Sequence, residues 1–218
     1  MSGRALLGGF AGLVASAWLF GYLASEVVEG ETGVDDEVAR SLHAHASPGW
    51  TDVFTAITWL GNLVALAVVL AAAAIVLARR RWYADLQFLL LAALGTKALT
   101  EVFKWSFQRE RPFFPDPLAS ESTYSFPSGH ASMSLAVYGS LAVIVARRLE
   151  QTWQRVAVLG GTAVLVALIG FSRLYLGVHF LSDVVAGYAL AIAWMLLCAL
   201  ALNLRWRQTS RYLASTKQ

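Results

Sequence analysis

Residues 56–78 read AITWLGNLVALAVVLAAAAIVLA, a run of 23 residues that carries no charged side chain. An α-helix of this length, at about 1.5 Å per residue, is long enough to cross the ~30 Å hydrocarbon core of a bilayer. The run stops at three consecutive basic residues, Arg79, Arg80 and Arg81. This stretch therefore predicts a membrane-spanning helix that ends at a membrane surface.

Five further apolar runs occur in the 218-residue chain, at about 5–24, 83–104, 129–146, 154–171 and 180–204. The runs at 129–146 and 154–171 are short unless their polar ends belong to the helices. Only 14% of all residues are charged, against about 25% in an ordinary soluble domain. We therefore expect an all-α fold, a bundle of six transmembrane helices forming a single membrane-embedded domain over residues 1–218.

The first run has two interpretations. Arg4, the apolar residues after it and Ala-Ser-Ala at 15–17 resemble a cleavable signal peptide. The apolar character continues through Trp18 and Tyr22, however. We therefore prefer a retained membrane anchor.

The basic residues are divided unequally between the two ends of the predicted bundle. With six crossings, one side receives Arg4, Arg79, Arg80, Arg81, Arg147, Arg148, Arg155, Arg205, Arg207, Arg211 and Lys217. The other side receives an acidic loop at 26–37 and the cations Arg40, Lys104, Arg109, Arg111 and Arg173. Because positively charged loops stay in the cytoplasm, we expect both termini to be cytoplasmic. Several of the remaining cations then lie at the outer boundary of the cell membrane, where charge is costly and needs a reason.

The first of three polar segments, Lys104-Trp-Ser-Phe-Gln-Arg-Glu-Arg111-Pro112, ends the third helix. Pro112 disfavours a helical conformation at the residue before it, so the chain should turn outward there. Lys104 and Arg111 are seven residues, or two helical turns, apart and can face the same way. Taken alone, the pair is explained more simply by two cations that extend to the membrane interface.

The second segment, Pro127-Ser128-Gly129-His130, opens the fourth helix. Ser128 is a good N-cap, and Gly129 allows a ligand to approach the backbone closely. The free N–H groups and the dipole at a helix start form an anion site, beside which His130 would project. An ordinary capped helix with an interfacial histidine is the alternative.

The third segment runs from Ser172 to Asp183 and connects the fifth and sixth helices. His179 and Asp183 are four residues apart, so they share a face if the sixth helix begins near His179. A carboxylate there accepts the Nδ1 proton and leaves Nε2 unprotonated as a nucleophile. Arg173 adds donors suited to phosphate oxygens. The alternative is a buried His–Asp hydrogen bond that only joins two helices.

The predicted topology puts all three segments on the same side of the membrane. Together they supply three cations, a helix N-terminus, two histidines and a carboxylate. This set suits phosphoryl transfer, in which positioning and charge neutralisation provide most of the catalysis. The segments lack the carboxylate cluster of a Mg²⁺ or Zn²⁺ site, so we expect neither a metal nor another cofactor. The expected partners are a lipid phosphate and membrane lipids, and not nucleic acid.

The motifs Lys-x6-Arg-Pro, Pro-Ser-Gly-His and Ser-Arg-x5-His-x3-Asp, in this order, resemble those of the type 2 phosphatidic acid phosphatase (PAP2) family. This family includes bacterial lipid phosphate phosphatases and undecaprenyl diphosphate phosphatases. With the six-helix layout, the resemblance covers nearly the whole chain. It implies a metal-independent membrane phosphatase acting on undecaprenyl diphosphate, phosphatidylglycerol phosphate or phosphatidate, ranked in that order because an outward site suits carrier-lipid recycling.

The same resemblance implies a role for each motif residue. His179 is the nucleophile and forms a phosphohistidine, while Asp183 orients it. His130 protonates the leaving oxygen and then activates water. The groups that bind phosphate oxygens are the side chains of Lys104, Arg111 and Arg173 and the backbone N–H groups at Ser128 and Gly129.

Two other functions are compatible with the same motifs. A non-catalytic lipid-phosphate binder or transporter would use the same scaffold, although it would not need both histidines. A vanadium-dependent haloperoxidase would have a similar phosphate pocket, although those enzymes are soluble.

Several charged residues near the motifs are expected to be structural. Arg109 could contact a diphosphate or a headgroup, but we expect it to be a solvated loop cation. We expect His43 and His45 to be solvated in the acidic loop. Lys97 and Glu101 should pair with each other within the third helix, or Glu101 with Lys104, because an unpaired charge in the membrane is costly.

Overall fold

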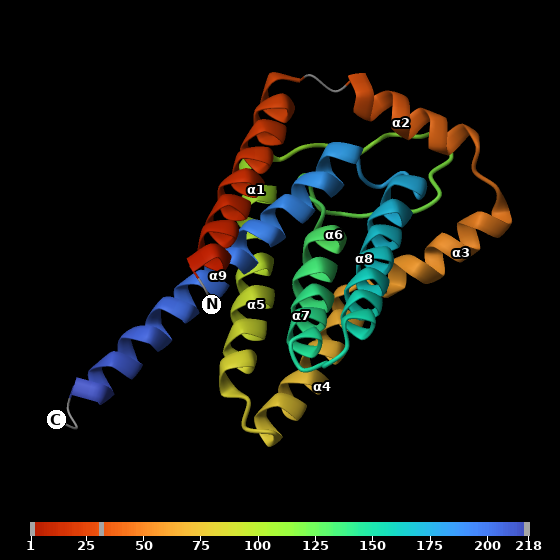
Figure 1. Cartoon of the computed structure of the whole chain (residues 1–218). Coiled ribbons are helices and arrows are strands. Elements are labelled where there is room, and N and C mark those ends of the chain that lie inside the picture. Colours follow the sequence, from red (N-terminus) through yellow and green to blue (C-terminus); the bar gives the residue numbers. More distant parts are fainter. Residues whose placement is uncertain (1–2, 31–32, 216–218) are drawn as a thin grey trace.

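The structure is a computed structural model that describes residues 3–30 and 33–215; the side chains of Arg4 and of residues after Asn203 lie outside the description. The described segments are helical and joined by short connections and one long loop (Figure 1). In chain order the elements are α1 (Gly3–Glu29), α2 (Gly33–Ala44), α3 (Pro48–Trp59), α4 (Leu63–Arg79), α5 (Tyr83–Phe107), α6 (Gly129–Ser134), the π-helical turn η1 (Leu135–Gly139), α7 (Ser140–Ala146), α8 (Thr152–Tyr175) and α9 (Leu181–Ser215).

Six spans within the described residues are long and apolar enough to cross a membrane. They are Ala5–Glu29, Pro48–Arg79, Tyr83–Phe107, Gly129–Ala146, Thr152–Tyr175 and Leu181–Asn203. The predicted all-α bundle of six membrane helices is therefore confirmed. The helix before the third segment reaches Tyr175, so Ser172 and Arg173 belong to α8 and lengthen the run that seemed short in the sequence.

The fourth span forms the centre of the bundle. It consists of α6, η1 and α7, and 56% of it is buried, the largest share of the six spans. Helices α5, α8 and α9 pack around it (Figure 1). Ala131, Ser132 and Ala136 are fully buried there, and such small residues let neighbouring helices approach closely.

The stretch 56–78, which the sequence predicts to be one continuous helix, is divided between α3 and α4. Asn62 caps the second of these helices, because its Oδ1 accepts a hydrogen bond from Val64 N–H at 2.8 Å. A Cβ atom at Gly61 would lie 2.5 Å from Ile169 Cγ2 and 3.0 Å from His130 Cδ2. The expectation of one helix is wrong, because Gly61 and the N-cap Asn62 interrupt the helix where the chain passes close to His130.

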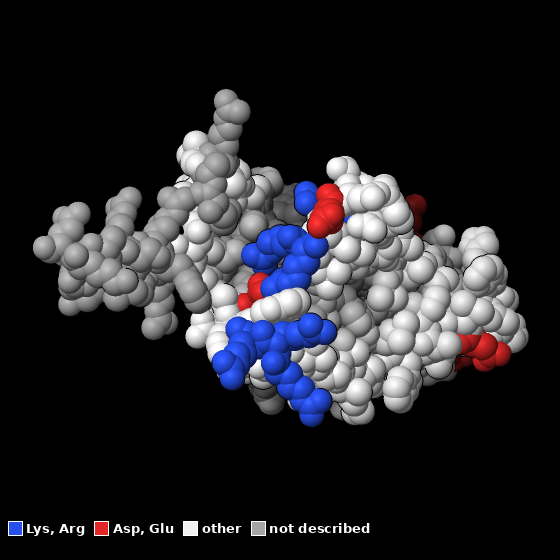
Figure 2. All heavy atoms as spheres, turned by 60° about the horizontal axis from the view of Figure 1, so that its bottom comes forward, with Lys and Arg blue, Asp and Glu red and all other residues white. Residues whose placement is uncertain are grey.

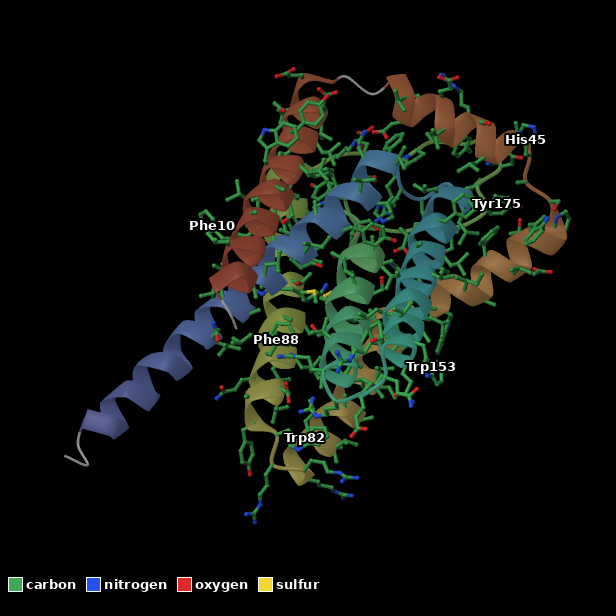
Figure 3. The ribbon with its side chains drawn as sticks, viewed as in Figure 1. Phe10, His45, Trp82, Phe88, Trp153 and Tyr175 are labelled. Carbon is green, nitrogen blue, oxygen red and sulfur yellow. The ribbon has the colours of Figure 1, made fainter. Side chains whose placement is uncertain are left out.

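The two ends of the bundle differ in charge. The α4–α5 and α7–α8 turns and the helix ends beside them carry a cluster of exposed arginines, which Figure 2 shows on the face that forms the bottom of Figure 1. These are Arg79, Arg80, Arg81, Arg147, Arg148 and Arg155. Trp82 and Trp153 lie at this end, whereas His45 and Tyr175 lie at the other (Figure 3). The unequal distribution of basic residues expected from the sequence thus exists in the folded chain for these six arginines. Arg4, Arg205, Arg207, Arg211 and Lys217 fall outside the described side chains.

The acidic loop after the first span contains a helix, α2, which lies across the opposite end of the bundle (Figure 1). Its Asp35 is buried, and its Oδ1 accepts a hydrogen bond from Ser182 N–H at the start of α9. His43 stacks on Phe114 with ring centroids 4.0 Å apart and contacts Asp116 at 3.0 Å. This hydrogen bond from His43 lowers the pKa of Asp116. The expectation that His43 is solvated is therefore wrong, because an aromatic neighbour and a carboxylate cover it.

Candidate active site

One pocket of about 170 Å³ is lined by residues from all three polar segments. These residues are Lys104 and Arg111 from the first segment, Gly129 and His130 from the second, and Arg173 and His179 from the third. Ser128 and Asp183 lie behind the pocket and are fully buried. The structure therefore brings the predicted site residues together at the end of the bundle where α2 lies.

The contact between His179 and Asp183 is built by a helix cap. His179 precedes α9 by two residues, so the pair does not lie on one helical face as the sequence suggests. Asp183 reaches back, and its Oδ2 accepts a hydrogen bond from Phe180 N–H at 2.8 Å, as the third residue of a capping box does. The same oxygen lies 3.3 Å from His179 Nδ1.

The neighbours of His179 define which ring nitrogen carries the proton. Arg111 Nη1 lies 3.2 Å from His179 Nε2. A guanidinium can only donate hydrogen bonds, so Nε2 is the acceptor and the proton resides on Nδ1, toward Asp183. Burial lowers the pKa of His179 to about 3, which keeps the ring neutral at physiological pH. A neutral imidazole with an Nε2 lone pair therefore faces the pocket.

Both oxygens of the Asp183 carboxylate are held by further donors. Oδ2 accepts a hydrogen bond from Ser125 Oγ, and Oδ1 accepts one from Arg109 Nη1 at 2.6 Å. Arg109 also donates to Asp35 Oδ2 at 2.8 Å and lies 4.3 Å above the Phe180 ring. Only 8% of its side chain is exposed. The prediction that Arg109 is a solvated loop cation is therefore wrong, since two buried carboxylates hold it.

The cations of the first segment reach the pocket from different backbone elements. Lys104 is buried near the end of α5, and its Nζ donates to Tyr124 O. The helix ends at Phe107, with Gln108 in a left-handed conformation (φ 46°), earlier than the proline at 112 suggests. Arg111 therefore lies in the loop, where its Nε donates to Thr123 O at 2.7 Å.

Arg173 occupies the α8 side of the pocket. Its Nη1 donates to Thr58 Oγ1 at 2.9 Å, and its Nη2 pairs with Glu121. Its Nε is buried and has no hydrogen-bond partner among the described atoms. Sequence reasoning missed Glu121, which lies in the loop between the first two motifs and has no local pattern to mark it. A carboxylate thus lies where an anion would meet the arginine.

The first two residues of α6, Gly129 and His130, line the pocket. Ser128 caps this helix, since its Oγ accepts from Ala131 N–H. Its own N–H donates to Asp183 O at 2.9 Å, so in this structure it ties two segments together and is not free for phosphate. The first amides of a helix have no carbonyl partner within it, which leaves those of Gly129 and His130 for an anion. A Cβ at Gly129 would make ordinary van der Waals contact with Thr100 Cγ2, at 3.9 Å, so no atom packs tightly against this glycine.

Comparison with known proteins adds evidence of ancestry to this geometry. The model of the PAP2 superfamily matches residues 85–207. This chain belongs to the PAP2 superfamily. Phosphatidylglycerophosphatase B of Bacillus subtilis is 33% identical over 164 residues, which are 72% of this chain and 78% of that protein.

Two solved PAP2 structures resemble the fold. A transmembrane PAP2 type phosphatidylglycerolphosphate phosphatase from Bacillus subtilis superposes with a TM-score of 0.75 at 31% identity, over 86% of this chain and 94% of that one. Aquifex aeolicus LpxE gives a TM-score of 0.59 at 24% identity, over 75% and 93% of the two chains, which shows the fold alone. The expected family is thus confirmed, and the chain is a multi-pass membrane protein of a lipid phosphatase family.

Proposed function

We propose that this PAP2 protein hydrolyses the terminal phosphate of a membrane lipid through a phosphohistidine intermediate, without a metal ion. The observation that carries the proposal is the arrangement at His179. Asp183 accepts a hydrogen bond from His179 Nδ1, while Arg111 donates one to His179 Nε2 on the pocket side. Once a phosphate takes over the hydrogen bonds of Arg111, a neutral histidine whose Nε2 lone pair lies among cations is arranged for attack on phosphorus.

In the first half-reaction, His179 Nε2 forms a bond to phosphorus as the bond to the lipid oxygen breaks. His130 gives a proton to the departing oxygen, and Asp183 stabilises the positive charge that develops on the nucleophilic ring. In the second half-reaction, His130 takes a proton from water, the water oxygen bonds to phosphorus, and the P–N bond breaks. General acid–base catalysis of this kind typically contributes about 10²- to 10⁴-fold.

The remaining pocket residues neutralise the charge of the transferred phosphoryl group. In this proposal Lys104, Arg111 and Arg173 contact its oxygens, assisted by the N–H of Gly129. Preorganised donors of this type stabilise the transition state most where water is excluded. Ser128 supports them by capping α6. The chemistry of the set, three cations and two histidines around one buried carboxylate, favours hydrolysis without a metal.

The choice of substrate draws on the relatives. The Bacillus subtilis sequence and the Bacillus subtilis structure are each named for phosphatidylglycerol phosphate, so we rank this lipid first, ahead of undecaprenyl diphosphate and phosphatidate. A non-catalytic binder or transporter is the alternative, and it would need neither the nucleophile His179 nor the proton-transfer group His130.

We further propose that both termini are cytoplasmic and that the pocket faces the outside of the cell membrane. The exposed arginines at the opposite end of the bundle support this orientation, because basic loops remain in the cytoplasm. An impermeant thiol reagent should label a cysteine introduced at Ser120, in a Cys198-free background, from outside intact cells. Labelling from the inside alone would overturn the outward site.

The activity itself is tested with purified protein, phosphatidylglycerol phosphate and a chelator. We expect phosphate release by the wild type, a loss of about 10³-fold or more for His179→Ala, and normal rates for His45→Ala, which removes an exposed histidine outside the pocket. With radiolabelled terminal phosphate and an alkaline quench, the wild type should give labelled protein, and His179→Ala, which lacks the nucleophile, should give none. Unchanged release by His179→Ala would refute the nucleophile, and a loss of activity in chelator would refute the metal-free reaction.

A further inference from the structure

The pocket continues along α5 to a second pair of charges. Lys97 and Glu101 line the same pocket as His179 and are ion-paired with each other, which is the first of the two pairings expected from the sequence. Lys97 lies seven residues before Lys104, or about 11 Å deeper along the helix axis. The pocket therefore extends from the phosphate-binding residues toward the middle of the membrane.

The Lys97–Glu101 pair lies at a depth in the membrane where charged side chains are energetically costly. Within the six described spans, no other charged residue lies as far from a span end as Lys97. The side chains of Lys97 and Glu101 are 39% and 41% exposed, and their helical neighbours Leu94 and Val102 are mostly exposed. The lower part of the pocket thus adjoins the lipid-facing surface of α5. Charges at such depth are rare in membrane helices and mark sites where ions or substrates bind.

The position of a bound lipid determines which part of its headgroup lies beside Lys97. If the terminal phosphate lies beside His179, the acyl chains extend from it into the bilayer. The part of the headgroup between the phosphate and the chains then passes the lower pocket, which is lined by Thr100 and Met133 as well as by the charged pair. An ammonium at this point selects for negative charge in the middle of the headgroup.

We propose that Lys97 forms a second anion subsite, an inference that rests on the proposed function. This subsite binds the phosphodiester of a lipid that carries two phosphates separated by a glycerol unit. An ammonium has three donors, so Lys97 can keep Glu101 and still donate to a phosphodiester oxygen. A lipid diphosphate differs, because its two phosphorus atoms share one bridging oxygen and both lie near Lys104. A phosphatidate has no second phosphate. The subsite thus favours phosphatidylglycerol phosphate over both.

The test compares kcat/KM for phosphatidylglycerol phosphate and phosphatidate. The variant Lys97→Gln/Glu101→Gln removes the subsite without leaving an unpaired charge in the membrane. Loss of a charge-assisted hydrogen bond predicts a decrease of about 10- to 100-fold for the two-phosphate lipid, mainly in KM. Phosphatidate and undecaprenyl diphosphate should change less than about two-fold. Lys97→Arg retains the charge and should restore most of the preference.

The outcomes separate this inference from the proposed function. Equal losses for all three lipids, or an unchanged preference for the two-phosphate lipid, would overturn the subsite while leaving the phosphatase intact. Wild-type hydrolysis of phosphatidate without hydrolysis of phosphatidylglycerol phosphate would do the same. Phosphate release that does not depend on His179 would instead overturn the proposed function.

Discussion

Arg109 Nη1 donates a hydrogen bond to Asp183 Oδ1 at 2.6 Å, and Arg109 Nη2 donates to Asp35 Oδ2 at 2.8 Å. This arginine connects α2, outside the spans, with the carboxylate that contacts His179. Asp35 also accepts from the backbone N–H of Ser182 at 2.9 Å. Helix α2 therefore helps to position the candidate nucleophile His179 through Arg109 and Asp183. These contacts are buried, so solvent screens them little.

Replacement of Arg109 should impair turnover more than substrate binding. We expect Arg109→Leu to lower kcat by about 10- to 100-fold, because Asp183 loses a charge-assisted donor of the kind that orients catalytic groups. KM should change little, because Arg109 does not line the pocket. Steady-state kinetics of the detergent-purified variant measure both parameters. Arg40→Leu, at an exposed position on α2, serves as the control, and a change confined to KM would contradict the positioning role.

Glu121 should compete with phosphate for Arg173. The two side chains are ion-paired in the pocket, so an incoming phosphate must replace the carboxylate as the partner of the guanidinium. We expect Glu121→Gln to lower the inhibition constant of inorganic phosphate several-fold, since a neutral amide is a weaker competitor. Glu110→Gln, which changes an exposed acid in the same loop, should have no effect. Weaker inhibition in Glu121→Gln would mean that Glu121 instead positions Arg173.

Gly187 should be intolerant of any side chain. A Cβ at this position would lie 2.7 Å from Ser128 O and 3.2 Å from Ala131 Cβ, so α9 could no longer pack against the start of α6. We expect Gly187→Ala to cost about 1–3 kcal/mol, as overpacking does, and to reduce activity at least about ten-fold by moving the α6 start and His130. Thermal unfolding and phosphate release measure the two effects. Gly160→Ala, in α8 with open space around it, should match the wild type in both.

The stability of the fold should fall on acidification because of His179. Its pKa is lowered by burial to about 3, against about 6.5 in an unfolded chain. Between these values the unfolded state takes up a proton that the folded state does not, so this group reduces stability as the pH falls from about 6.5 toward 3, by up to about 1.4 kcal/mol per pH unit. The midpoint of thermal unfolding, followed by tryptophan fluorescence in detergent, should therefore fall more steeply between about pH 6.5 and 4.5 for the wild type than for His179→Gln. Parallel curves would contradict the neutral buried histidine.

The spans and the motifs were predictable because they depend on local properties of the chain. A hydrophobic run of sufficient length has few alternatives to a membrane helix, and the fourth span, Gly129–Ala146, has the bounds expected from the sequence. The convergence of the three segments was predictable as well, because alternate crossings put them at one end of the bundle. The division of 56–78 was missed, since hydropathy outweighed the signals of Gly61 and Asn62.

The residues that support the site, Asp35, Arg109 and Glu121, could be identified only from the tertiary structure. Asp35 and Arg109 are 74 residues apart in sequence, and Glu121 and Arg173 are 52 apart. No periodicity links such positions, because their contacts depend on how α2 and the long loop lie over the bundle. A charged residue in a polar loop has the same local pattern whether it is solvated or paired. Tertiary packing determines that Arg109 is paired and not solvated, because burial of Arg109 and Asp35 is favourable only when each satisfies the charge of the other.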